Sequence, residues 1–175
     1  MATQNVCSRC AQSGKTCCQE TDIYLTVGDI KRIAGYIARL DFYEYRRPLD
    51  PLYLDQNDDP DWGRQTIRSD GTRRVLKQKE GRDCLFLQEN GCLLATAVRP
   101  LVCRLHPYTY TRGGLAGILD QRCLAARQQS LEMLPAEFGM SYVQAQAWHL
   151  QLYNEIFVHE GIECNEDWHH LRPAV

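Results

Sequence analysis

Apolar residues recur every three or four positions between residues 26 and 40, and this spacing predicts a helix with one buried face. The positions concerned are Ile30, Ile33, Ala34, Ile37 and Leu40. Thr26 followed by Asp29 resembles the capping box that begins such a helix. The opposite face carries basic residues, which we expect to be solvated: Lys31, Arg32 and Arg39.

A second long helix is predicted from Ser141 to about Glu160, because Ser141 and Gln144 form a capping box and Gly161 would end the helix. Its buried stripe is predicted to contain Val143, Ala147, Leu150, Tyr153, Ile156 and Phe157. A shorter helix is predicted over residues 123–134, with Pro135 ending it.

Short strands are predicted at residues 23–25 and 73–78, and a hairpin at residues 108–120 that turns at Gly113 and Gly114. Asn90 and Gly91 predict a tight turn that would bring Cys84 and Cys92 together. Prolines and aspartates fill residues 46–70, which we expect to form a long surface connection with room for a short helical turn.

The composition of the chain argues against nucleic acid and membranes as binding partners. The chain has 175 residues, an ordinary hydrophobic fraction of 44% and a formal net charge of -2, which gives no support to a phosphate-binding surface. No stretch approaches the roughly 18 apolar residues that a membrane span needs. The first residues lack a basic segment followed by an apolar run. We therefore expect no nucleic-acid partner, no membrane and a cytoplasmic location.

Nine cysteines are the unusual feature of the composition. Eight of them fall into two groups, Cys7, Cys10, Cys17 and Cys18, then Cys84, Cys92, Cys103 and Cys123. In a reducing compartment, clustered cysteines predict metal ligands before disulfides, although disulfides and inert core thiols remain alternatives. The Cys7–Cys10 spacing is typical of tight turns that present two thiolates to one metal.

The adjacent pair Cys17 and Cys18 suggests more than one metal site. Neighbouring side chains of extended backbone point to opposite sides, so two adjacent thiols would feed two sites, or one would ligate while the other packs or bridges. Eight candidate ligands divide into two four-thiolate sites, but spacing leaves their partition open.

The order of these motifs resembles the bacterial cysteine-cluster proteins called the YkgJ family. The resemblance covers about residues 7–123 and consists of C-x2-C-x6-C-C, then C-x-F-L, G-C and R-P-x-x-C-R. That family is described as carrying a zinc- or iron-chelating domain. The resemblance implies metal ligation by Cys7, Cys10, Cys17, Cys18, Cys84, Cys92 and Cys103. Cys123 is similar to the family's later cysteine, but lacks its usual Cys-Pro-Gly context.

His106 stands where related proteins tend to have Phe before the proline, which implies a further ligand or proton donor beside the site. Arg99 and Arg104 flank Cys103. A zinc ion with four thiolates is a dianion, and its burial requires cationic or N–H partners. We therefore expect both arginines to donate to the ligand sulfurs, the alternative being that they bind an anionic substrate.

These observations predict an α+β fold: a small cysteine-rich domain centred on metal, with short strands, one N-terminal helix and a C-terminal helical segment. The predicted units are residues 1–125, the metal-binding domain, and residues 126–175, a helical extension packed on it. The tail adds Cys164, His169 and His170, either a second metal site or an unligated end. Cys164 is the ninth cysteine, and we predict that it binds no metal.

Zinc and an iron–sulfur cluster use the same ligands, and the spacing here does not separate them. We expect a non-enzymatic metal protein with a structural, delivery or redox role. One alternative is an enzyme with an open metal position near His106, since the YkgJ resemblance includes a flagellin lysine N-methylase. Another is an interaction protein in which metal stiffens a docking face for a protein partner.

Overall fold

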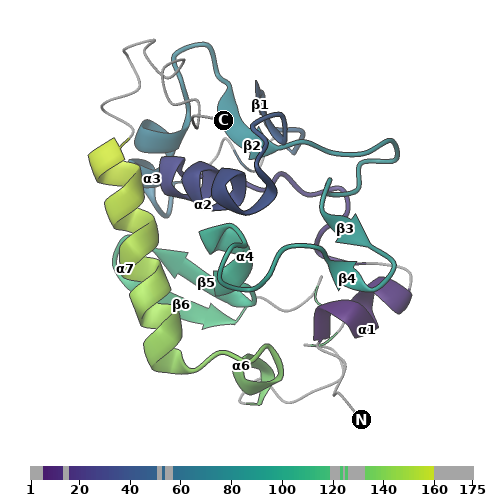
Figure 1. Cartoon of the computed structure of the whole chain (residues 1–175). Coiled ribbons are helices and arrows are strands. Elements are labelled where there is room, and N and C mark those ends of the chain that lie inside the picture. The colour runs from purple at the N-terminus through teal and green to yellow at the C-terminus, as the bar shows by residue number, and fades with distance from the viewer. Residues whose placement is uncertain are drawn as a thin grey trace.

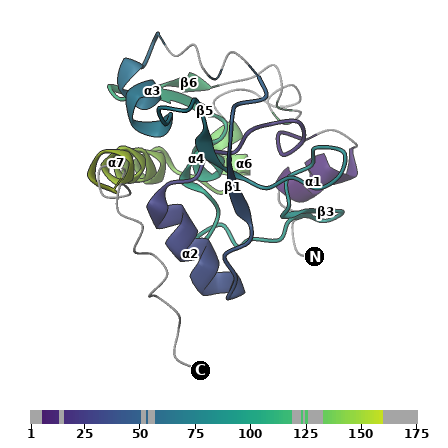
Figure 2. The same ribbon diagram turned by 90° about the horizontal axis from the view of Figure 1, so that it is seen from above.

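The computed structural model describes residues 6–13, 16–50, 53, 57–118, 123, 125 and 133–159. These residues form an α+β fold of short elements, as predicted. The helices are α1 (Val6–Gln12), α2 (Val27–Ile37), α3 (Pro60–Thr66), α4 (Leu101–Leu105), α6 (Leu134–Glu137) and α7 (Tyr142–His159). α7 runs along one side of the molecule, α1 lies on the other, and α4 lies between them (Figures 1 and 2).

The strands pair as three separate antiparallel two-stranded sheets. β1 (Tyr43–Arg46) pairs with β2 (Arg73–Leu76), β3 (Leu87–Gln88) with β4 (Gly91–Cys92), and β5 (Tyr108–Thr111) with β6 (Gly114–Ile118). An isolated two-stranded sheet is marginal in water, so each pair depends on the elements packed against it. The predicted hairpin at residues 108–120 is confirmed over β5 and β6.

β2 confirms the predicted strand at residues 73–78 over its first four residues. Residues 23–25 run beside β2, and Tyr24 makes a single bridge to Val75. The partner strand β1 was not predicted, and α3 occupies the short helical turn allowed within residues 46–70. Asp59 caps α3 by accepting a hydrogen bond from the Trp62 amide.

α2 begins as predicted. The Thr26 hydroxyl accepts from the Asp29 amide at 2.9 Å, and the Asp29 carboxylate accepts from the Thr26 amide at 3.1 Å. The helix ends at Ile37 because Ala38 adopts a left-handed conformation, with φ of 54°. Leu40, predicted on the buried face, therefore lies beyond the helix and is 58% exposed.

Arg32 does not lie on a solvated face, contrary to the sequence prediction. Its guanidinium pairs with the carboxylates of Asp29 and Glu155, each at 2.6 Å. Asp29 is fully buried and also accepts from the Leu101 amide at 3.0 Å, at the start of α4. Glu155 belongs to α7 and accepts from the Thr26 hydroxyl. One charged network thus joins α2, α4 and α7.

The predicted start of α7 is confirmed, because the Ser141 hydroxyl accepts from the Gln144 amide at 3.2 Å. The predicted buried stripe is wrong in its first half: Val143 and Leu150 are 73% and 63% exposed, and Ala147 is also exposed. The buried stripe is shifted around the helix and consists of Ala145, His149, Leu152, Tyr153, Glu155 and Ile156.

Pro135 does not end a helix, because it is the second residue of α6. Most of the predicted helix at residues 123–134 lies outside the described residues, as does the tail from residue 160 onward. Among the helices that the structure describes, none is long and apolar enough to cross a membrane.

Among the described residues, the core consists of three apolar clusters. The first packs α2 against β2 and the segment around Phe86, and the second packs α4 against α3 and α7. The third is small and contains Val6, Cys123 and Ala125, with Cys10 and Phe138 against it. Cys18, Cys92 and Cys103 pack at the edge of the first cluster. The cysteines therefore lie among the core clusters.

Replacing Arg32 with Met is expected to destabilise the protein by about 3 kcal/mol at pH 7, because two buried carboxylates lose their cation. Without Arg32 the pKa of Asp29, already raised by burial, rises further. A carboxyl whose folded pKa is raised costs stability as pH increases, so the deficit should shrink between pH 7 and pH 5. Urea unfolding of the variant and the parent protein at both pH values measures this difference in the free energy of unfolding.

The matched control is Arg39→Met, because Arg39 pairs with Asp41 at 2.6 Å on an exposed surface. Its unfolding midpoint should match that of the parent protein. Equal midpoints for the two variants, or a deficit in Arg32→Met that does not change with pH, would contradict the role assigned to the network.

Candidate metal centre

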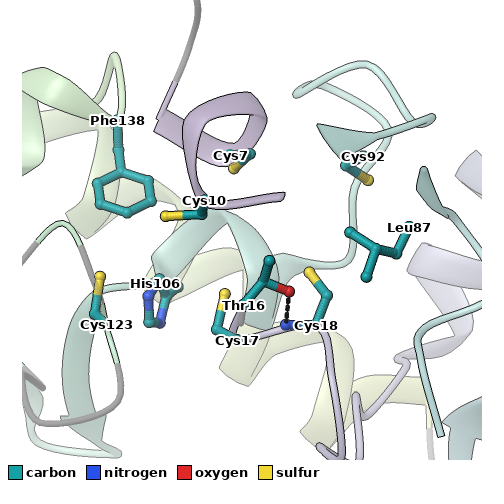
Figure 3. A pocket seen from close by; sticks show the side chains of 10 residues that line it. All are labelled: Cys7, Cys10, Thr16, Cys17, Cys18, Leu87, Cys92, His106, Cys123 and Phe138. Carbon is teal, nitrogen blue, oxygen red and sulfur yellow. Dashed lines mark hydrogen bonds between the residues drawn. The ribbon is translucent and has the colours of Figure 1, made fainter. Parts of the chain in front are cut away.

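Six thiols line one small cavity, which we call the thiol cavity. They belong to Cys7, Cys10, Cys17, Cys18, Cys92 and Cys123, and His106, Thr16, Leu87 and Phe138 complete the wall. Figure 3 shows these side chains arranged around a common space, with His106 beside Cys123. The cavity volume is about 20 Å³, room for about one water molecule.

Cys84 and Cys103 lie next to this cluster. Both line a larger adjoining cavity that also reaches Cys7, Cys18 and Cys92. Burial raises the pKa of both Cys84 and Cys103, and the charge of a neighbouring Cys18 thiolate would raise both further, as expected of sulfurs close to one another. The structure thus brings all eight predicted cysteines into one region.

α1 supplies Cys7 and Cys10, which were predicted to lie on a tight turn. They lie instead one turn apart on a helix, where residues at positions i and i+3 share a face. Val6, the first residue of α1, is 2% exposed and packs with Cys123. Burial of Val6 therefore turns the cysteine face of α1 toward the cavity.

The β3–β4 hairpin places Cys92 beside α1. Its turn at Asn90 and Gly91 was predicted, and the Ser8 hydroxyl donates to the Asn90 carbonyl at 2.7 Å. Gly91 has φ of +104°, and a Cβ there would lie only 3.1 Å from the Ser8 amide nitrogen. A glycine is needed at this position for both its backbone conformation and its close approach to α1.

The prediction that the adjacent thiols of Cys17 and Cys18 point to opposite sides of an extended backbone is wrong. Cys17 and Cys18 lie in a turn, and both line the thiol cavity. Although Cys17 as a residue is exposed, its thiol donates a hydrogen bond to the Cys18 sulfur. Thr16, which sequence reasoning missed, fixes the turn by accepting from the Cys18 amide at 3.1 Å. Because both thiols line the same cavity, their adjacent positions in the sequence do not indicate two separate metal sites.

Arg99 contacts the sulfurs, and Arg104 supports Arg99. The Arg99 guanidinium donates to the Cys7 sulfur at 3.5 Å and also to Cys92, and its Nε donates to the Leu94 carbonyl at 2.9 Å. The Nε of Arg104 donates to the Arg99 carbonyl at 2.7 Å. Among the described residues, Arg104 donates to no thiol, so only Arg99 makes the predicted contact.

His106 follows α4 and faces the cavity, next to the ring of Phe138 at 5.6 Å between centroids. Its Nε2 atom is buried without a hydrogen-bond partner among the residues described here. Burial lowers the pKa of His106 to about 4, so the imidazole is neutral at pH 7. A neutral imidazole with a free nitrogen is the form that ligates metals. Phe138 was not singled out from the sequence.

Burial keeps most of these thiols protonated. It raises the pKa of Cys7, Cys10 and Cys92, and raises the pKa of Cys84 to about 12. The hydrogen bond from Cys17 has the opposite effect on its acceptor and lowers the pKa of Cys18. A metal would have to displace the protons, because the thiolate is the ligand form.

The described cysteines are free of disulfides, so the S–S alternative fails for these eight. Within the same residues, no three Cys, His, Asp or Glu side chains are grouped so that they could hold a metal ion. Cys164, His169 and His170 lie outside the described residues, and their predicted roles stay predictions. Comparisons with protein-family models, curated proteins and solved structures found no match, so the YkgJ resemblance also stays a prediction.

Replacing Gly91 with Ala is expected to push α1 away from β4 and to expose Cys7. Its control is Gly81→Ala, because Gly81 also has a positive φ, +85°, but a Cβ there would meet nothing within 4 Å. Both variants carry the strain of a left-handed residue, about 1–2 kcal/mol. The Gly91 variant should lose more stability and react faster with a thiol reagent in chelator-treated protein.

Urea unfolding and the rate of thiol modification compare the two variants directly. The same stability and the same rate in both would mean that contact with Gly91 does not position Cys7.

Proposed function

We propose that this chain is a metal-binding protein that holds zinc or an iron–sulfur cluster through its clustered cysteines, in a structural, delivery or redox role. The observation that carries the proposal is the thiol cavity, where six free thiols and one histidine from separate segments face a common space. Soft thiolates are the ligands that zinc and iron–sulfur clusters share.

The way these thiols converge supports ligation more than ordinary packing. The cysteines of the thiol cavity come from α1, from the turn at residues 16–18, from the β3–β4 hairpin and from position 123. Beside the cavity, α4 supplies Cys103. No disulfide joins the described cysteines, so nothing covalent requires them to meet. A hydrophobic core has no need of sulfur at each of these positions. Metal binding would have to draw the thiols closer together, because no three of the described side chains are grouped so that they could hold a metal ion.

The local charge also favours anionic sulfurs. Arg99 contacts Cys7 and Cys92, and its positive charge lowers the pKa of Cys18 after the larger effect of the Cys17 hydrogen bond. A guanidinium in contact with ligand sulfurs offsets the negative charge of a thiolate site. Binding would compete with protons, so metal affinity should rise with pH.

The second candidate is an enzyme with an open metal position near His106. It is favoured by His106, which lines the cavity and whose buried Nε2 has no partner in the described part of the chain. In that case the cysteines would hold the metal, and His106, whose imidazole is neutral at pH 7, would hydrogen-bond to a substrate or accept a proton from it.

Metal and acid-labile sulfide should be measured on full-length protein purified without oxygen. We expect stoichiometric metal, with zinc and no sulfide for a structural site, or iron with equal sulfide for a cluster. Cys18→Ser and Cys92→Ser should each lose at least half of the metal, because both thiols line the thiol cavity.

Cys164→Ser is the matched control, since Cys164 is the predicted unligated cysteine, and it should keep the full metal content. Parent protein without stoichiometric metal, or full metal content in both cavity variants, would rule out the proposed function.

A further inference from the structure

A second cavity of about 1010 Å³ adjoins the thiol cavity, and we call it the aromatic cavity. Part of its wall is formed by large aromatic rings that surround one arginine: Tyr24, Tyr53, Trp62, Tyr110, Tyr153 and Arg73. Two further arginines, Arg82 and Arg99, line other parts of the wall. A volume of this size accommodates a small organic molecule. The proposed metal function assigns it no role.

Arg73 is a buried cation that forms no salt bridge with the described residues. Burial lowers the pKa of its guanidinium, and the negative charge of the Asp22 carboxylate offsets this only in part. It is the first residue of β2 and is 2% exposed. Within the described residues its guanidinium makes no hydrogen bond and no ion pair, and its buried Nε has no partner. Its contact is with the face of the Tyr53 ring, 4.8 Å from the centroid. The neighbouring Arg74, by contrast, donates its Nε to the Leu25 carbonyl at 2.8 Å.

Two carboxylates that line the cavity, those of Asp22 and Asp59, are already hydrogen-bonded. Asp22 accepts from the Arg46 guanidinium at 2.5 Å with one oxygen and from the Leu49 amide at 2.7 Å with the other. Asp59 accepts from the Trp62 amide at 3.3 Å, from the Arg112 amide at 3.0 Å and from the Tyr153 hydroxyl. Glu20 and Asp58, two further carboxylates on the wall, are exposed to solvent, and Asp50 is half-buried.

Trp62 supplies a second unused donor in the same wall. Its indole Nε1 is buried and has no acceptor in the described part of the chain. The ring is held by edge contacts with Tyr24 and Tyr153, at 5.4 Å and 6.0 Å between centroids. A guanidinium and an indole can only donate, so both require an acceptor that the described residues do not provide.

We infer that the aromatic cavity binds a small organic anion, whose carboxylate or phosphate pairs with Arg73 and whose planar body lies against the tyrosine and tryptophan rings. An unpaired buried charge and an unsatisfied donor are each costly, and an oxyanion satisfies the guanidinium. The aromatic rings provide the stacking surface. The inference does not depend on bound metal, although the anion would lie beside the proposed metal site.

Fluorine NMR of three probes tests the inference on full-length protein: para-fluorobenzoate, para-fluorophenyl phosphate and the neutral para-fluorobenzyl alcohol. One or both anions should bind and the alcohol should bind much more weakly. Arg73→Met should weaken anion binding about 10- to 100-fold, the loss expected for a charge-assisted hydrogen bond. Its unfolding midpoint should stay close to that of the parent protein, because the removed charge forms no salt bridge with the described residues and the variant loses only the contact of the guanidinium with the Tyr53 ring.

Three further variants sharpen the test. Arg73→Lys keeps the charge and should retain the preference for anions, whereas Trp62→Phe keeps an aromatic ring and should weaken binding less than Arg73→Met. Arg68→Met is the matched control, because Arg68 also lies over a tyrosine ring, that of Tyr45 at 4.5 Å, but is exposed and outside the cavity. It should bind as the parent protein does.

Equal binding of the anions and the alcohol would overturn the inference, as would a lower midpoint for Arg73→Met, which would give Arg73 a structural role. Anion binding that survives Arg73→Met but disappears after chelation would place the anion on the metal. That result would overturn the inference and support the metal site. Binding that depends on Arg73 in protein without metal would support the inference even if the metal function fails.

Discussion

The buried carboxylate of Asp29 is the interaction on which the arrangement of the helices depends. It closes the capping box of α2, accepts from the Leu101 amide at the start of α4 and pairs with Arg32. Arg32 extends the network to Glu155 on α7. Because α4 carries Cys103 and is followed by His106, a network formed away from the thiols positions one wall of the thiol cavity.

The thiol cavity adds a second constraint, which is electrostatic. Burial favours protonated sulfurs, whereas Arg99 and the Cys17 hydrogen bond favour a thiolate at Cys18. Several neutral thiols pack like small apolar groups, but several thiolates repel one another unless a cation lies between them. In the proposed account, metal supplies that cation. In the aromatic cavity the unsatisfied group is instead a cation, since the buried Arg73 guanidinium forms no hydrogen bond and no salt bridge with the described residues.

Local features of this fold could be predicted from the sequence, and long-range ones could not. The capping boxes at Thr26 and Ser141 and the turn at Asn90 depend on neighbouring residues, and all three were predicted. The pairing of β1 with β2 and the exposure of Leu150 depend on packing between distant segments. The cysteine spacing predicted convergence, but the turn at Cys17 is set by Thr16, and the orphan donors of Arg73 and Trp62 leave no pattern in the sequence.

The central claim is that several cysteine sulfurs bind one metal centre. X-ray absorption at the metal edge, on full-length protein purified without oxygen, measures the ligand atoms directly. For zinc, the account predicts a first shell dominated by sulfur at about 2.3 Å. For a cluster, it predicts iron with a sulfur shell and a further iron neighbour. A first shell of oxygen and nitrogen, or protein that contains no metal, would contradict the account.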